Sequence, residues 1–355
     1  MTTILIKDKL RQSVEVASGG LRTVLYTTKG QPTFMNIVEK FLLSDIDVSL
    51  PATVHPAFII NGVEKDKIFV GTYEAVVRNG ELLSIQNEVP THSLTIDAFA
   101  AYAKASGAGF HMITNAEWSA IALKTFKNNT QPLGNTYYGR SIEDATKYGK
   151  RADGLSAIAG ITSGNPITLN GSGPVEWNDN RKYNGISDLS GNLSEFCAGL
   201  RLINCELQVI PNNNAAYADT SATSTEWRAI NAITGEYVAL GSANTVKIAN
   251  SGTDDYTLVY NSSTSLFSSI TNPGLRKVSD AALNVLKSLL LFPMSQVTGS
   301  LGSDTISTGN NTNELICLRS RTHWSGTQAG IFQLSLNEQR SFADRTTTRL
   351  AYYAP

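Results

Sequence analysis

The spacing of apolar residues along the chain predicts both helices and strands. In Leu94–Ala105 the apolar residues recur every three or four positions, which is typical of a helix with one buried face. The same spacing in Ser279–Phe292 predicts a second helix. Phe332, Leu334 and Leu336 instead occupy every second position, which predicts a strand with one face toward the core.

A third helix is predicted from its first turn. The hydroxyl of Thr114 is placed to accept a hydrogen bond from the amide of Glu117, while the Glu117 carboxylate reaches back to the start of the helix, an arrangement known as a capping box. Trp118 and Ile121 then fall on one face of the predicted helix. This face is expected to be buried.

Segments of different character divide the chain. Residues 1–50 hold a strand-like run at Thr23–Tyr26 and a predicted helix at Phe34–Leu43. We interpret them as a small N-terminal module for attachment or oligomerisation, with an ordinary part of the main domain as the alternative. Residues 51–355 are expected to form one α+β domain. Within it, residues 206–275 contain short alternating runs that predict a β-rich insertion.

Composition favours an uncharged surface built from ordered loops. Hydrophobic residues make up 41% of the 355 residues, whereas charged residues make up only 17%, below the usual share of about a quarter. Residues 134–184 are rich in Gly, Asn and Tyr and are expected to form long surface loops. The formal net charge of −1 argues against a nucleic-acid partner. No apolar run is long enough for membrane insertion.

Three segments, in a consistent order, resemble formylglycine-generating-enzyme-type domains. Gly109–Trp118 is similar to one motif of that family, and Asn184–Phe196, with its Asp-Leu-Ser-Gly-Asn core, is similar to its most specific motif. Leu318–Tyr353 stands where that family has its terminal strands. The resemblance spans roughly residues 55–355 and implies a C-type-lectin-like fold. The residues expected to be buried in its core are Trp118, Leu189, Phe196, Phe332, Leu334 and Leu336.

The C-terminal region is also similar to the variable proteins of diversity-generating retroelements. In Trp324–Ser341 the residues that match that family's fixed positions alternate with polar residues at its changeable positions. Gly199–Leu202 and Glu206 resemble phage members of the family, which include the tropism determinants of phage tail fibres. The chain departs from the pattern at Ser320–Arg321, where the family has Gly-Gly, and at Thr347–Tyr352, where it has Gly-Phe-Arg.

Together, the alternation and the resemblance predict a variable ligand-binding region at residues 318–353. A strand with a buried apolar face can change its outer residues with little loss of stability, because those residues lie outside the core. The residues expected to face a ligand are Thr322, His323, Trp324, Ser325, Gln328, Gln333, Ser335, Asn337, Glu338, Phe342, Asp344 and Arg345.

Patterns for catalysis or metal binding are weak. Formylglycine-generating enzymes carry two cysteines near the C-terminal strand, whereas only Cys317 lies there in this chain, and all three cysteines are expected to be apolar core residues. Neither a GxSxG nucleophile motif nor a phosphate-binding GxxxxGK[ST] loop occurs. Asp179, Asn180 and Asp188 are possible calcium ligands without a fixed loop pattern. We therefore expect no enzyme activity, no metal and no cofactor.

The expected function is host adhesion by a phage receptor-binding protein of the tail fibre. The expected partners are a host cell-surface receptor, either protein or glycan, and other tail proteins of the virion. A site made of short polar side chains is expected to bind its ligand weakly. Several linked copies of the site raise the overall affinity, so a homotrimer is expected. The N-terminus has no signal-peptide pattern, which favours synthesis in a cytoplasm and assembly into a virion. The alternatives are a variable ligand-binding protein on a bacterial cell surface and a divergent formylglycine-generating-type enzyme.

Overall fold

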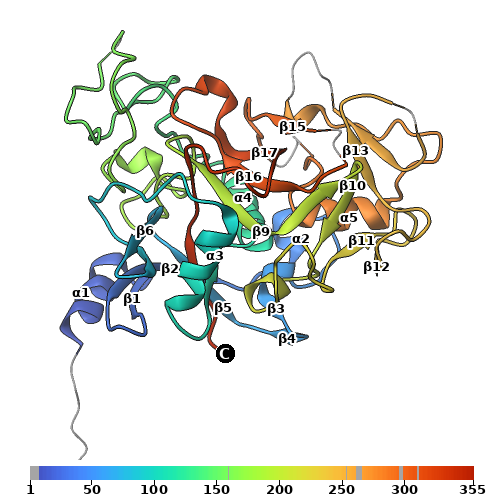
Figure 1. Ribbon diagram of the computed structural model, residues 1–355, viewed down its shortest axis with the longest axis horizontal. Coiled ribbons are helices and arrows are strands. Elements are labelled where there is room, and N and C mark those ends of the chain that lie inside the picture. Colours follow the sequence, from blue (N-terminus) through green and yellow to red (C-terminus); the bar gives the residue numbers. More distant parts are fainter. Residues whose placement is uncertain (1–7, 159, 253, 261–265, 296–298, 310–311) are drawn as a thin grey trace, which may run out of the picture.

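The computed structural model describes residues 8–158, 160–252, 254–260, 266–295, 299–309 and 312–355. In this part of the chain, helices and strands combine into an α+β fold, which confirms the predicted class (Figure 1). The α-helices are α1 (Lys9–Ser18), α2 (Leu43–Ile46), α3 (Ile96–Ala105), α4 (Asn115–Asn128) and α5 (Asp280–Ser288).

The predicted helices begin at side chains that cap them. At the start of α4, Thr114 Oγ1 accepts from the Glu117 amide at 3.1 Å, and Glu117 Oε2 accepts from the Thr114 amide at 3.0 Å. The predicted capping box is therefore confirmed. Thr95 and Ser279 cap α3 and α5 in the same way, with hydroxyls that accept from the first turn.

A five-stranded antiparallel sheet joins the two ends of the chain. Its order is β1-β2-β5-β19-β8. Ala351 of the C-terminal strand pairs with Val70 on one side and His111 on the other. The strands are β1 (Arg22–Tyr26), β2 (Pro32–Glu39), β5 (Lys67–Gly71), β19 (Leu350–Tyr352) and β8 (Phe110–Met112).

Strand β2 corrects the prediction for the N-terminal segment. The helix predicted at Phe34–Leu43 is wrong, because most of this segment lies in β2, which is hydrogen-bonded to β1 on one side and β5 on the other. Pairing on both edges outweighs the local apolar spacing. These hydrogen bonds also cross the boundary expected near residue 50, which favours the alternative that residues 22–39 are part of the main domain.

A larger sheet has the path β12-β11-β10-β9-β16-β17-β15, with β13, β14 and β18 joined at its sides. The short strands predicted within residues 206–275 are present as β10 to β14. The members are β9 (Ser194–Ile203), β10 (Glu206–Val209), β11 (Arg228–Ile230), β12 (Tyr237–Val238), β13 (Lys247–Ala249), β14 (Thr257–Val259), β15 (Ile306–Thr308), β16 (Leu315–Ser320), β17 (Gly330–Gln339) and β18 (Thr346–Thr347). Two separate hairpins pair β3 (Ile59–Ile60) with β4 (Val63–Glu64) and β6 (Ala75–Arg78) with β7 (Glu81–Ser84).

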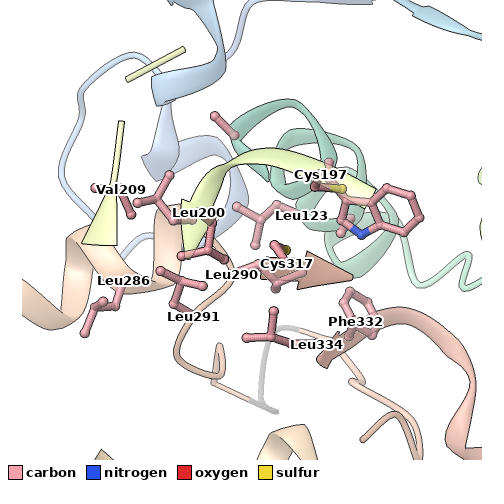
Figure 2. Packing of buried hydrophobic residues seen from close by; sticks show 14 of the residues in the cluster. Leu123, Cys197, Leu200, Val209, Leu286, Leu290, Leu291, Cys317, Phe332 and Leu334 are labelled. Carbon is pink, nitrogen blue, oxygen red and sulfur yellow. The ribbon is translucent and has the colours of Figure 1, made fainter. Parts of the chain in front are cut away.

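A continuous apolar core lies where the larger sheet meets α4 and α5 (Figure 2). Phe332 and Leu334 of β17 point into this core alongside Leu290 and Leu291, which follow α5. The core therefore supports β17, the strand on which the predicted variable region is built. All six predicted core residues are buried, namely Trp118, Leu189, Phe196, Phe332, Leu334 and Leu336.

Candidate ligand-binding surface

The loop of residues 321–329 joins β16 to β17 and begins with an unusual turn. Ser320 and Arg321 both have left-handed backbone, with φ of 73° and 70°, a conformation that residues other than glycine rarely adopt. The Ser320 hydroxyl donates to the carbonyl of Gly191 at 2.9 Å, and Arg321 Nη1 donates to Gln328 Oε1 at 2.6 Å. These bonds hold the strained turn in place.

Main-chain hydrogen bonds then attach this loop to its neighbours. The amide of His323 donates to the Asn192 carbonyl at 3.1 Å, and the His323 carbonyl accepts from the amide of Tyr138 at 2.7 Å. The amide of Gly326 donates to the carbonyl of Thr136 at 2.9 Å. The loop is thus fixed against residues 136–138, which are far away in sequence.

The turn Asp188–Asn192 anchors the long loops of residues 134–184. Asp188 Oδ2 accepts from the Gly171 amide at 2.7 Å, and Asn192 Oδ1 accepts from the Thr168 amide at 2.8 Å. Asp188 and Asn192 have left-handed backbone with φ of 61°, which Asp and Asn tolerate better than most residues. The motif singled out in the sequence therefore organises the loops around the candidate surface.

Trp324 is the most prominent predicted ligand-facing side chain. Its indole is 38% exposed, and the Arg345 guanidinium lies over it, 4.4 Å from the ring centroid. The imidazole of His323 packs edge-on against the same indole at 4.4 Å between centroids. An exposed indole held between a cation and a second ring is pre-organised to contact a ligand.

The ring contacts continue into the neighbouring loop. Tyr138 packs edge-on against His323 at 5.8 Å between centroids, and Tyr137 packs against Tyr138 at 5.2 Å. The guanidinium of Arg140 lies 5.1 Å from the centroid of the Tyr137 ring. We refer to this unbroken set of contacts as the aromatic series. Its members are Arg140, Tyr137, Tyr138, His323, Trp324 and Arg345.

The structure sorts the twelve predicted site residues by exposure. Five are exposed: Trp324, Gln328, Asn337, Asp344 and Arg345. Five are half-buried: Thr322, Ser325, Ser335, Glu338 and Phe342. The remaining two, His323 and Gln333, are buried, so the expectation that they are exposed is wrong.

His323 is buried because its ring lies between Tyr138 and Trp324. Burial lowers the pKa of the imidazole to about 4, and the nearby positive charges of Arg345 and Arg151 act in the same direction. The ring is therefore neutral near pH 7. Its role in this surface is to hold Trp324 in position.

Gln333 is buried because β17 is covered on both faces along Ile331–Leu334, where four consecutive side chains are buried. The alternation of buried and outward positions begins only at Ser335. Neither polar atom of the Gln333 side chain has a hydrogen-bond partner among the described residues. This side chain therefore cannot contact a ligand without rearrangement of the strand.

The twelve residues also fail to form one patch. Residues 322–328 lie beside Arg345 at the start of β17, whereas Asn337 and Glu338 lie near its end. At about 3.3 Å per residue, the seven steps along the strand from Gly330 to Asn337 separate the two groups by roughly 23 Å. Phe342 is partly buried against a second apolar cluster, which includes Phe99, Phe196 and Ile316, so it contributes to the core as well.

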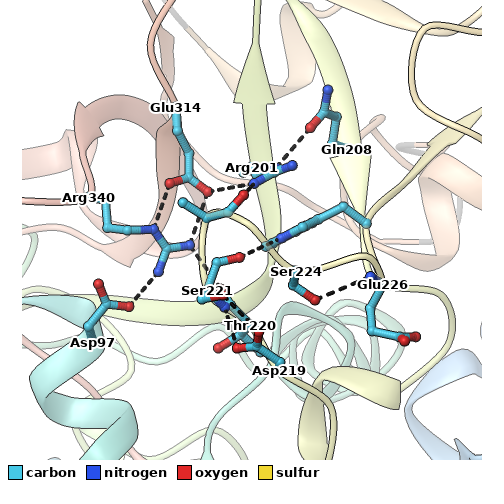
Figure 3. Close-up of polar contacts among 12 residues, drawn as sticks. Asp97, Arg201, Gln208, Asp219, Thr220, Ser221, Ser224, Glu226, Glu314 and Arg340 are labelled. Atoms are coloured by element: carbon cyan, nitrogen blue, oxygen red, sulfur yellow. Dashed lines mark hydrogen bonds and ion pairs between the residues drawn. The ribbon is translucent and has the colours of Figure 1, made fainter.

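A polar network fixes the end of β17 (Figure 3). Arg340 Nε binds Glu314 Oε2 at 2.6 Å, and its Nη1 binds a carboxylate oxygen of Asp97 in α3. Arg201 Nη1 binds Glu314 Oε1 at 3.0 Å, and its guanidinium lies 4.2 Å from the ring centroid of Trp227. The network ties the end of the variable region to the rest of the fold.

Sequence reasoning missed Tyr137, Tyr138 and Arg140. They lie in the Gly- and Asn-rich segment that was predicted only as surface loops. A pair of adjacent tyrosines in a segment without apolar periodicity was a usable signal, because such rings have no core face to occupy. Their packing against His323, however, could not be read from the sequence.

His111, which is paired with the Glu117 carboxylate, borders a cavity of about 800 Å³. His111 Nδ1 faces the Gly109 carbonyl and Nε2 faces Glu117 Oε1, both at 2.9 Å. Because both partners are acceptors, both ring nitrogens must donate, which requires the imidazolium form. Burial lowers the pKa of His111, but the Glu117 carboxylate outweighs it, and the net shift is upward. Neither nitrogen is free to serve as a base.

The cysteines and the possible metal ligands are engaged within the fold. Cys197 and Cys317 are buried as predicted, whereas Cys205 is only half-buried, so the expectation of a core position is wrong for Cys205. Asp179 Oδ1 accepts from the Ile186 amide, and Asn180 Oδ1 accepts from the Lys182 amide. Across the described ranges, no group of three or more His, Cys, Asp or Glu side chains is arranged to hold a metal ion.

Comparison with protein-family models and with curated proteins finds no match for this chain. Among the residues that the structure describes, no helix is long and apolar enough to span a membrane.

Proposed function

We propose that this chain is a phage receptor-binding protein with a C-type-lectin-like fold, and that the aromatic series contacts the host receptor. The main support for the proposal is that the side chain of Trp324 is exposed to solvent while Arg345 and His323 hold its indole in place. Trp and Arg side chains contribute a large share of binding energy at protein interfaces. Loops on a rigid scaffold are also where binding residues usually lie.

The backbone at Ser320–Arg321 supports the family resemblance. Both residues adopt the left-handed conformation at the position where the resembled family carries Gly-Gly. Glycine reaches this conformation without steric cost. Sequence and backbone therefore agree at a position where the residue types differ, which favours the C-type-lectin-like interpretation.

The test is adsorption of fluorescently labelled protein to a panel of bacterial strains. We expect the wild-type protein to bind a subset of strains, and Trp324→Ala and Arg345→Ala to reduce binding to them at least tenfold with unchanged folding. The matched control is Tyr183→Ala, which removes an aromatic ring that is 62% exposed and bonded to α1 instead. Equal binding by all variants would exclude the aromatic series as the receptor site.

Two further measurements address the biological setting. Sequencing of the flanking DNA is expected to find tail genes, with a reverse transcriptase and a second copy of the segment encoding residues 318–353. Cell-envelope genes in place of tail genes would favour the bacterial surface protein. Light scattering is expected to give a homotrimer, and a monomer with full adsorption would contradict the multivalent arrangement.

A further inference from the structure

A cavity of about 640 Å³ opens among the loops of residues 140–172, next to the aromatic series. This volume is in the range of small-molecule sites. Tyr148, Leu155 and Ile158 line it and are 60%, 48% and 59% exposed. Large apolar side chains are usually covered, so this exposed group marks a surface suited to a ligand with an apolar face.

The lining of this cavity carries positive charge. Arg140, Lys150 and Arg151 line it, and none of its described lining residues is an Asp or Glu. Asp153, close by, is already engaged, because it binds Arg151 through both carboxylate oxygens and accepts from the amide of Leu155. Arg151 and Asp153 compensate each other, so the positive charge that favours an anionic ligand comes from Arg140 and Lys150.

Arg151 retains an unused donor. Its side chain is fully buried, Nε and Nη2 donate to Asp153, and Nη1 has no hydrogen-bond partner in the described chain. A buried guanidinium nitrogen without an acceptor is costly. Because this nitrogen is buried with the rest of its side chain, a ligand would reach it only after the loop moved. Arg140 and the exposed Lys150 are the lining cations that a ligand carboxylate meets.

Hydroxyl groups complete the lining. Ser156, Ser172 and Thr146 border the cavity, and the Ser172 hydroxyl accepts from the Lys150 amide at 2.9 Å. Hydroxyls both donate and accept, which suits the alcohol groups of a sugar. The lining cations Arg140 and Lys150, the aromatic ring of Tyr148 and the hydroxyls together match a sugar ring that carries an acid group.

We propose that this cavity binds an acidic sugar residue of a host surface polysaccharide. The carboxylate pairs with Arg140 and the exposed Lys150, and the apolar face of the sugar ring packs against Tyr148. Arg140 also belongs to the aromatic series, so the bound sugar lies beside the surface that includes Trp324. This inference rests on the proposed function in taking the bound molecule to come from the host surface.

The test is saturation-transfer NMR and calorimetry with oligosaccharides of galacturonate, glucuronate and N-acetylneuraminate. Each probe is paired with its carboxyl-reduced, neutral counterpart. We expect the full-length protein to bind at least one acidic probe and to bind the neutral counterpart at least tenfold more weakly. Equal binding of both members of a pair, or no binding of any acidic probe, would overturn the proposal. Binding of a tri-aspartate peptide in their place would identify the cavity as a peptide site.

Variants of the lining residues test whether the acidic probe binds in this cavity. Arg140→Gln and Tyr148→Ala are expected to weaken binding of the acidic probe at least tenfold. The matched control is Arg276→Gln, because Arg276 also lies over a tyrosine, Tyr256, but belongs to residues outside the cavity. If Arg140→Gln binds the acidic probe as tightly as the wild-type protein does, the sugar binds elsewhere and the proposal is wrong.

The adsorption assay separates this inference from the proposed function. If Trp324→Ala abolishes adsorption while no acidic sugar binds, only the cavity assignment fails. If acidic sugars bind the cavity but Trp324→Ala leaves adsorption unchanged, the aromatic series fails as the receptor site and the cavity stands.

Discussion

The indole Nε1 of Trp118 donates a hydrogen bond to the carbonyl of Ile331 at 2.8 Å. This bond joins α4 to β17, so a helix fixed by its own capping box positions the strand that follows the candidate binding loop. The loop can be rigid because its supporting strand is held by both the core and this bond.

Replacing Trp118 with Phe should destabilise the protein by about 1–3 kcal/mol. The change removes part of a fully buried side chain and leaves the Ile331 carbonyl without its donor. Urea unfolding measures the loss. Phe126→Leu, a buried aromatic change in the same helix with no hydrogen bond to lose, serves as control, and equal costs for the two variants would argue against a role for the hydrogen bond.

Phe332→Ala should cost about 3–5 kcal/mol, as expected for large-to-small changes in a core. Phe332 is completely buried on β17. Asn337→Ala, at an exposed position of the same strand, should change stability by less than about 0.5 kcal/mol. An unchanged melting temperature for Phe332→Ala would show that the strand register is different.

Gln333→Met should stabilise the protein by about 1–3 kcal/mol. The native amide is buried with neither polar atom bonded to a described residue, so removing it removes a desolvation cost at similar volume. Thermal unfolding measures the change. A lower melting temperature in the variant would mean that the amide is satisfied in solution.

Arg321→Gly should stabilise by about 0.5–1 kcal/mol. Left-handed backbone costs a non-glycine residue about 1–2 kcal/mol. The greater flexibility of unfolded glycine and the loss of the exposed Arg321–Gln328 hydrogen bond offset part of the gain. Gly326→Ala is the converse control: its φ is +59° and open space surrounds the added methyl group, so the variant should lose about 1 kcal/mol. Denaturant unfolding of both variants checks the pair, and two changes of the same sign would contradict the strain argument.

The stability of the protein should fall in acid because of His55. Its Nε2 faces the Ser288 carbonyl at 2.8 Å and its Nδ1 accepts from the Ala57 amide at 3.1 Å, so the buried ring is neutral. Burial lowers its pKa to about 3. The unfolded chain therefore binds the extra proton first, and stability present above about pH 6.5 is lost progressively as the pH falls toward 3.

Chemical unfolding between pH 3 and 7 checks this prediction. His55→Gln has no titrating ring and should show a shallower decrease in stability over this interval. An identical slope in both proteins would assign the acid sensitivity to other groups.

Local rules made several features predictable from the sequence. The capping box of Thr114 and Glu117 depends on four neighbouring residues, so α4 was correctly predicted. The alternation of Phe332, Leu334 and Leu336 identified the core face of β17 for the same reason. The prediction failed at β2, where hydrogen bonds to β1 and β5 decide the structure and the segment alone does not show them.

The sequence by itself determined the helices α3, α4 and α5, the α+β class and the six residues named for the core, because these follow from short-range spacing and from the removal of apolar surface from water. Only the tertiary structure decided which polar residues remain accessible. The side chains of His323 and Gln333 were predicted to be exposed because they are polar and alternate with apolar residues. Neighbouring loops bury His323, and Gln333 is buried because β17 is covered on both faces there. The contact between Tyr138 and His323 joins residues 185 positions apart (323 − 138). Such contacts exist only once the chain has folded, so the aromatic series and its cavity belong to the tertiary structure.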